Sequence, residues 1–470
     1  MRPAAAELMS ASRGGSVYTR VVVLISVMWG ALGPAYAQQA QADLVARMKE
    51  GDLASVRRLL QHGADVNRPA KDGATALHWA VHRGDLPAVR LLLGSGANAN
   101  VANVYGVTPI SLACLNGDAA IVRALLDAGA DVNGGRPPAE QPLMTAARTG
   151  NTVIVSALVV HGAKIDAQEP EKHQTALMWA AAEGHADVVE ALIKAGAHVD
   201  LRSSGGFTAL LFAGRSGSVG AARALLAAGS PVNDTTPKRE TPLLIAAASG
   251  HTEFVKFLLA QGADPNLPDE GGFSPLHAAI WGQSDTLDMV KALIAGGANV
   301  TAKLLRPPPP LTLYGLGFAG VGSMVGATPF ALAAAHANLP VMRTLVDAGA
   351  NPLAPTNDGT TPFLFAAGQG WTVGNSPVTL AMGLEAVKQL DAWGGDVNTT
   401  NASGLTPLHV AANNGADDII QFLIDHGANV NAKDKRGRTA IQIARAANIG
   451  GAVQEFKTVV ERLKKAGAVD

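Results

Sequence analysis

Glycine and histidine motifs are the places where this 470-residue sequence could do chemistry. Residues 315–320, Gly-Leu-Gly-Phe-Ala-Gly, match the G-x-G-x-x-G fingerprint that cradles a dinucleotide phosphate. The fingerprint needs a strand before it, a helix directly after it and an acidic residue about 20 positions on. Here four prolines, 307–310, precede it, and the first downstream acid is Asp347. We therefore interpret it as a chance match, and keep a nucleotide-dependent enzyme or binder as an alternative.

No other pattern indicates catalysis or metal binding. The sequence has twelve histidines but no H-E-x-x-H or G-x-S-x-G motif. Its one cysteine, Cys114, allows neither a disulfide framework nor a Cys-cluster metal site, and its apolar neighbours favour a buried side chain. We predict no catalytic residue, no metal site and no cofactor.

The composition excludes several classes of protein. Hydrophobic residues make up 48% of the chain, charged residues 16% and aromatic residues 4%. This is too apolar for a disordered chain and too poor in Lys and Arg for a nucleic-acid-binding protein. A net charge of −1 gives no long-range attraction to nucleic acid or anionic lipid. Few aromatic and many small residues favour closely packed helices.

The first 37 residues have the pattern of a cleavable secretory signal. Arg13 and Arg20 precede the apolar run 21–32, and residues 35–37, Ala-Tyr-Ala, follow as an A-x-A cleavage site. The run is too short for a membrane-spanning helix, which needs about 20 apolar residues. We predict cleavage after Ala37, export to the periplasm and no stable membrane insertion afterwards. A membrane-tethered scaffold that keeps this segment is the alternative.

From residue 40 onward the sequence repeats with a 33-residue period. A hexapeptide of the form Thr-Pro-Leu-His-x-Ala recurs with steps of 33, 33, 34, 33, 33, 33, 54, 33, 45 and 33 residues. Its copies begin at Thr75, Thr108, Gln141, Thr175, Thr208, Thr241, Ser274, Thr328, Thr361, Thr406 and Thr439. A second motif, close to Gly-Ala-Asp-Val-Asn, keeps step with it, as at 63–67, 129–133, 262–266 and 427–431.

This pattern resembles the ankyrin repeat, a β-turn plus two helices with a T-P-L-H-x-A signature. The resemblance covers residues 40 to 470 and implies an all-α solenoid of about twelve helix-turn-helix units with short β-turn fingers. The atypical end units, around 43–48 and in a charged helix over 454–465, are predicted to be caps. In this family the imidazole of the signature forms structural hydrogen bonds, which implies that role for His78, His277 and His409.

Each residue type in the unit has a physical reason. Thr can accept hydrogen bonds from the unpaired N–H groups at the helix start, and Pro fits the first helical turn. Glycines such as Gly84, Gly117, Gly150 and Gly415 are predicted to end the first helix. A single unit cannot bury its apolar face, so we expect stability to come from stacking.

Two insertions interrupt the period. We divide the mature chain into repeats over 38–302, a Pro- and Gly-rich insertion over 303–327, and a second block of repeats over 328–470. The second insertion, around 370–383, falls between the two helices of one unit. Insertions in solenoids often form binding surfaces, but a longer surface loop also costs little. A binding role and a packing role therefore both stay open.

The resemblance also implies where a partner would bind. Ankyrin proteins usually meet a partner on the concave face, through the turn before the Thr and the end of the first helix. The residues predicted to bind there are Tyr105, Arg148, Glu183, Phe207, Arg215, Glu240, Phe273 and Trp281. Aromatic and arginine side chains are frequent hot spots, although Phe207 and Phe273 could instead pack on neighbouring turns. Trp79 and Trp179 are predicted to be core residues.

Together these features predict a non-catalytic protein–protein interaction scaffold. Its partner is another protein, whose identity the sequence does not give. A eukaryotic secreted origin stays open, in which case Asn233 and Asn299 would be glycosylation acceptors.

Overall fold

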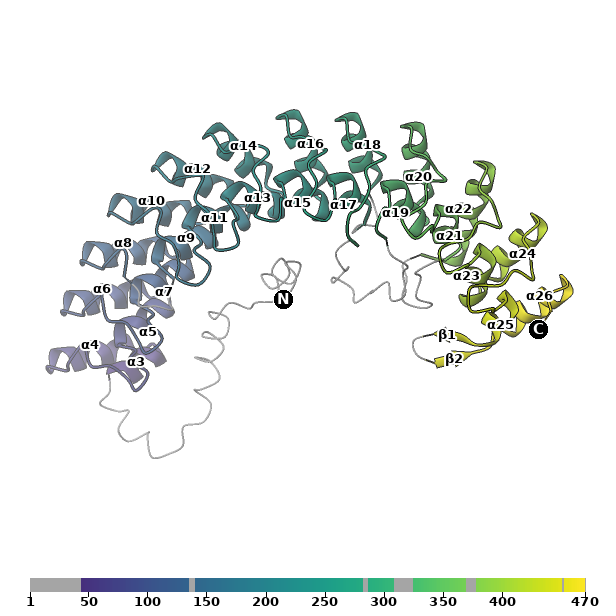
Figure 1. The fold of residues 1–470 in the computed structure, drawn as a ribbon. Coiled ribbons are helices and arrows are strands. Elements are labelled where there is room, and N and C mark those ends of the chain that lie inside the picture. Colours follow the sequence, from purple (N-terminus) through teal and green to yellow (C-terminus); the bar gives the residue numbers. More distant parts are fainter. Residues whose placement is uncertain are drawn as a thin grey trace. The chain divides into compact units, whose positions relative to one another are not determined.

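The structure is a computed structural model that describes residues 44–134, 140–281, 286–307, 324–368, 378–449 and 452–469 (Figure 1). The predicted signal, residues 1–37, and the glycine motif at 315–320 lie outside the described residues. The described chain divides into two compact units: an N-terminal unit up to Pro237 and a C-terminal unit from Lys238.

The N-terminal unit consists of six helix pairs. The first helices of the pairs are α3 (Leu44–Glu50), α5 (Ala76–His82), α7 (Pro109–Asn116), α9 (Pro142–Thr149), α11 (Ala176–Ala182) and α13 (Ala209–Ser216). The second helices are α4 (Leu53–Gln61), α6 (Leu86–Gly94), α8 (Ala119–Asp127), α10 (Thr152–Val160), α12 (Ala186–Lys194) and α14 (Val219–Ala227). First helices pack on first helices and second helices on second helices, so the unit has two helical layers (Figure 1).

The C-terminal unit repeats this arrangement. Its first helices are α15 (Pro242–Ala248), α17 (Pro275–Trp281), α19 (Pro329–Ala335), α21 (Pro362–Ala366), α23 (Pro407–Asn413) and α25 (Ala440–Arg445). Its second helices are α16 (Thr252–Ala260), α18 (Leu287–Ala295), α20 (Leu339–Asp347), α22 (Leu380–Ala392), α24 (Asp417–Asp425) and α26 (Lys457–Lys465). The described residues therefore contain twelve helix pairs, which confirms the predicted number of repeats and the all-α solenoid.

The repeated motif starts and ends the first helices as predicted. Thr108 has an extended backbone, and its hydroxyl accepts a hydrogen bond from the N–H of Ser111 at 3.4 Å. Pro109 occupies the first turn of α7. Gly117 ends this helix with a φ of 74°, in the left-handed region that favours glycine.

The core lies between the two layers and between neighbouring repeats. Each second helix buries one aliphatic face, as Val188, Val189 and Leu192 do in α12. Burying one such side chain contributes about 2 kcal/mol. Among the described residues, the main contacts between helices join neighbouring repeats, so the stability of each unit is approximately a sum of local terms.

Asparagine side chains join neighbouring repeats at the turns after six of the second helices: α4, α6, α8, α16, α22 and α24. The Asn67 carbonyl oxygen accepts a hydrogen bond from the N–H of Asn98 at 2.7 Å, and its amide donates to the carbonyl of Gly96 at 3.0 Å. The same two bonds are made by Asn100, Asn133, Asn266, Asn398 and Asn431. We call this set the asparagine ladder. Each asparagine hydrogen-bonds to one backbone N–H and one backbone carbonyl, which would otherwise have to bond to water.

The C-terminal cap differs from the prediction of one helix over 454–465. The helix α26 begins at Lys457, and an antiparallel hairpin of β1 (Ala447–Ile449) and β2 (Ala452–Gln454) precedes it (Figure 1). Phe456 fixes this boundary, because its N–H donates to the carbonyl of Ala444 at 3.0 Å and its ring lies against Gly415.

The second insertion also differs from a simple loop. Residues 369–377 lie outside the described residues, but α22 begins at Leu380 and has 13 residues, whereas α20 has 9. Thr379 caps α22 by accepting a hydrogen bond from the N–H of Met382 at 3.2 Å. Part of the predicted insertion therefore extends a helix.

Candidate functional site

The residues predicted to bind a partner lie on the first helices and in the turns before them. We call the partly exposed surface of these elements the first-helix face. Tyr105 is half-buried in the turn before α7, and its N–H donates to the side chain of Asn103 at 2.9 Å. Glu183 is exposed directly after α11.

The structure brings Arg148 together with two side chains from neighbouring elements. Arg148 Nε lies 3.6 Å from a carboxylate oxygen of Glu140, in the turn before the same helix. Its guanidinium carbon also lies 6.0 Å from the ring centroid of Trp179, on the next first helix. The side chains of Arg148 and Glu140 are only 21% and 12% exposed. Burial raises the pKa of the Glu140 carboxyl above its usual range, while the charge of Arg148 opposes this shift.

A second cluster lies on α13. The rings of Phe207 and Phe212 are 5.3 Å apart, and the guanidinium of Arg215 lies 5.9 Å from the Phe212 centroid. Phe207 and Arg215 are half-buried, whereas Phe212 is buried. Burial lowers the pKa of Arg215, and the nearby carboxylate of Glu183 opposes this effect.

The residues of the C-terminal unit that were predicted to bind a partner are less exposed to solvent. Glu240 is half-buried in the turn before α15. Phe273 and Trp281, which were predicted to meet a partner, are instead only 5% and 6% exposed. The Phe273 ring stacks on His277, with centroids 6.0 Å apart, and the Trp281 ring meets His336 edge-on at 5.3 Å. These contacts use the rings for packing within the unit.

Two tryptophans are more exposed than predicted. Trp79 and Trp179 were predicted to be core residues but are half-buried. Lys49 Nζ lies 5.5 Å from the Trp79 ring centroid, in the same way as Arg148 lies over Trp179. Both rings stand four residues after the Thr that starts the first helix, so a count from this Thr would have identified them.

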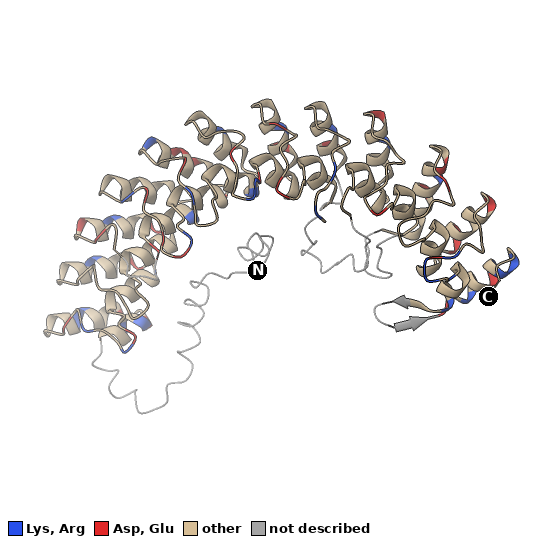
Figure 2. Ribbon diagram, in the orientation of Figure 1, with Lys and Arg blue, Asp and Glu red and all other residues tan. Residues whose placement is uncertain are grey.

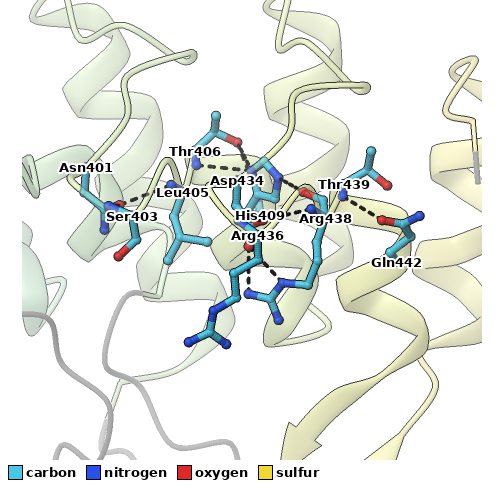
Figure 3. Close-up of polar contacts among 10 residues, drawn as sticks. All are labelled: Asn401, Ser403, Leu405, Thr406, His409, Asp434, Arg436, Arg438, Thr439 and Gln442. Carbon is cyan, nitrogen blue, oxygen red and sulfur yellow. Dashed lines mark hydrogen bonds and ion pairs between the residues drawn. The ribbon is translucent and has the colours of Figure 1, made fainter.

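The histidines of the repeated motif form structural hydrogen bonds, as the resemblance implied (Figure 3). The Thr406 N–H donates to His409 Nδ1 at 3.2 Å, and His409 Nε2 contacts the carbonyl of Arg438 at 3.0 Å. His78 makes the same contacts with Thr75 and Val107. Such a ring ties one repeat to the turn of the next.

Burial keeps these histidines neutral. Burial lowers the pKa of His277 to about 4, and it also lowers the pKa of His78, His336 and His409. Cys114 is buried as well, and burial raises the pKa of its thiol, so it carries no reactive thiolate. Within the described part of the chain, no three His, Cys, Asp or Glu residues are close enough together to hold a metal ion.

Family models match most of these repeats. Models described as ankyrin repeats match residues 44–135, 143–236, 210–303, 325–357 and 394–444, which together make up more than half of the chain. The chain belongs to the ankyrin-repeat family. Ankyrin repeats are protein–protein interaction scaffolds and are generally non-catalytic.

Individual relatives match only over parts of their length. The chain is 30% identical to the mouse "B-cell lymphoma 3 protein homolog" over 176 residues, which are 37% of this chain and 33% of that protein. It is 47% identical to human Rabankyrin-5 over 51 residues, or 11% of this chain and 4% of that protein. The human ASB11 ankyrin repeat domain is a similar solved structure, with 26% identity and a TM-score of 0.43, covering 47% of this chain and 98% of that domain.

Proposed function

We propose that this chain is an exported, non-catalytic scaffold that binds another protein on the first-helix face of its N-terminal unit. The observation that carries the proposal is a set of partly exposed aromatic rings: Trp79 and Trp179 each lie beside a cationic side chain, and Phe207 lies against Phe212. Tryptophan, tyrosine and arginine dominate the binding energy of protein interfaces. A fold made of rigid stacked helices can present them without rearrangement, which lowers the entropic cost of binding.

Export is the second part of the proposal. It is supported by the basic residues, the apolar run 21–32 and the Ala-Tyr-Ala site at 35–37. No helix among the described residues is long and apolar enough to cross a membrane. N-terminal sequencing of the chain recovered from the periplasm should give Gln38 as the first residue. An intact Met1 in the membrane fraction would contradict cleavage and support a tethered scaffold.

The binding surface can be tested by site-specific photo-crosslinking of the full chain in its native host. A photoreactive phenylalanine analogue at position 207 should give one discrete crosslinked protein. The matched control places the same analogue at Val160, which is 82% exposed at the end of the second helix α10. Crosslinking of the same protein from both positions would place the interface elsewhere. Crosslinking from neither, together with no partner in affinity capture, would contradict the scaffold proposal.

A further inference from the structure

The last turns of the first helices in the N-terminal unit share one register position. It is occupied by the residue two places before the glycine that follows each first helix. We call these six residues the end row: Lys49, His82, Leu115, Arg148, Ala182 and Arg215. All six are at least partly exposed, and no acidic residue occurs among them. Three are Lys or Arg, and each of these three lies beside an aromatic ring.

We propose that the end row binds an extended acidic segment of the partner protein, with carboxylates of that segment reaching Lys49, Arg148 and Arg215. This inference rests on the proposed function and adds the chemistry of the bound segment. The occupant follows from charge complementarity, because a row of cations on a partly desolvated surface attracts carboxylates and disfavours basic segments.

The surroundings of two of the cations support an incoming anion. Burial lowers the pKa of Lys49 and of Arg215, which means that their environment disfavours the charged form. The attraction of Asp72 for Lys49 and of Glu183 for Arg215 opposes burial without cancelling it. A carboxylate of the partner would add to this attraction.

The acidic neighbours of the row leave room for such a carboxylate. Glu50 pairs with Arg47 at 3.0 Å, on the turn beside Lys49. Glu140 lies 3.6 Å from Arg148 Nε. The Arg148 side chain is still 21% exposed, so part of it can be reached from solvent.

The repeat spacing sets the length of the bound segment. Packed helices lie about 8–10 Å apart, so Lys49 and Arg148, three repeats apart, are separated by about 30 Å. Arg148 and Arg215, two repeats apart, are separated by about 20 Å. An extended chain rises about 3.3 Å per residue. The acidic residues of the segment should therefore be about nine and about six positions apart, within a stretch of about 16 residues.

The test is selection of random 16-residue peptides, displayed on phage, for binding to the full chain. We expect the selected peptides to be rich in Asp and Glu at the spacing given above. A synthetic copy of the best peptide should bind the variant K49Q/R148Q/R215Q about tenfold more weakly than wild type, and raised salt should weaken wild-type binding.

Two further variants keep the test interpretable. K49Q/R215Q retains the contact between Arg148 and Glu140, so it should fold normally and still lose affinity. R57Q/R90Q/R123Q removes three exposed charges from the second helices α4, α6 and α8, and should bind the peptide like wild type. Circular dichroism and melting temperature check the fold of each.

Three results would overturn the acidic-segment proposal: no selected peptide, selected peptides without acidic residues, or equal losses in the end-row and control variants. They would leave the scaffold function intact if position 207 still crosslinks a protein. Loss of that crosslink, with no captured partner, is the result that would count against the scaffold itself.

Discussion

The two units share one frame but differ in what their first helices present. In the N-terminal unit, the residue four places after the starting Thr is half-buried Trp79, Leu112 or Trp179 in three repeats. In the C-terminal unit the residues at this position are all buried: Ile245, Ala278, Leu332, Phe365, Val410 and Ile443. The first helices α15, α17, α19 and α21 also contain no Lys, Arg, Asp or Glu (Figure 2).

The end-row position shows the same contrast. In the N-terminal unit it holds Lys49, Arg148 and Arg215, whereas the equivalent residues of the C-terminal unit carry no charge: Ala248, Trp281, Ala335, Gly368, Asn413 and Ala446. The residue types that form the helix pair are similar in the two units, whereas the residue types on the first-helix face differ. In a repeat protein, folding constrains the face positions least, so this difference is consistent with the binding role proposed above for the N-terminal unit.

The largest expected effect tests whether the two units respond separately. Leu125→Ala, in the N-terminal core, should lower the free energy of unfolding by about 3 kcal/mol, because it removes a fully buried side chain and leaves a cavity. Hydrogen exchange should accelerate in α8 and its neighbours and remain unchanged in the C-terminal unit. Leu345→Ala should give the mirror result. The control Val153→Ala, at a half-exposed side chain, should change little, and spread of either effect to both units would break the comparison.

The next effect concerns acid, which should destabilise the C-terminal unit first. The unit contains His277, His336 and His409, whose pKa values burial lowers, whereas in the described N-terminal unit burial lowers only that of His78. The folded state then binds fewer protons than the unfolded state, so stability falls as pH drops from 6.5 toward about 4. For His277 we expect a loss of about 2 kcal/mol between pH 6.5 and pH 5.

His277→Gln provides the control for this prediction. Gln442 occupies the same position in the last repeat and accepts a hydrogen bond from the Thr439 N–H at 3.1 Å, so the fold tolerates it. Hydrogen exchange of α17 should be less sensitive to acid in this variant than in wild type. Equal acid sensitivity of the two proteins would mean that His277 does not cause it.

A smaller effect is expected from the buried pair on the N-terminal face. Arg148→Met should cost about 1.5 kcal/mol, because it leaves the Glu140 carboxylate buried without its cation. Glu140→Gln should show the opposite pH dependence to that of the histidines. The folded-state pKa of Glu140 is raised, so wild type should lose stability relative to this variant as pH rises through 4.5 and above. Thermal melts from pH 4 to 8 compare the three proteins, and parallel curves would contradict the assignment.

The smallest effect concerns the ladder, which occurs in both units. Asn133→Ala should cost about 1 kcal/mol, because two backbone groups of the next repeat lose their partner. Asn133→Asp should cost less, since a carboxylate still accepts from the Lys164 N–H but cannot donate to the Gly162 carbonyl. Asn398→Ala should cost the same in the C-terminal unit. Local hydrogen exchange at these turns measures the effect of all three substitutions. A larger loss of stability in one unit would show that the two units also differ in how their repeats are joined.

The helix pairs could be predicted from the sequence, because the start and end of each helix depend on residues close to it in the chain. Thr, Pro and Gly at fixed spacing determine where a helix starts and ends, and Thr108, Pro109 and Gly117 do so as expected. The exposure of side chains on the first-helix face depends on contacts between neighbouring repeats, and the 33-residue period does not determine these contacts. Trp281 was predicted to be available to a partner but is buried, and its ring meets that of His336 in the next repeat.

Other differences have the same origin. Trp179 is half-buried, and the side chain that lies over its ring is an arginine of the preceding repeat, Arg148. The start of α26 depends on Phe456 finding the bare backbone of Gly415, more than 40 residues away in sequence. Neither contact follows from the residue types near it. The exported state and the glycine motif at 315–320 stay predictions, because they fall outside the described residues.

The asparagine ladder has a consequence for how such a chain can change length. Asn67 bonds to Gly96 and Asn98, and Asn100 bonds in the same way to Gly129 and Asp131. If a genetic deletion removed residues 68–100, Asn67 would be joined to Val101 and would occupy the place of Asn100. It would then reach the same two backbone groups, Gly129 and Asp131, so both hydrogen bonds at the joint would be kept. Loss or duplication of a whole 33-residue repeat therefore preserves the hydrogen bonds between neighbouring repeats. Unequal recombination can lengthen or shorten the protein in this way.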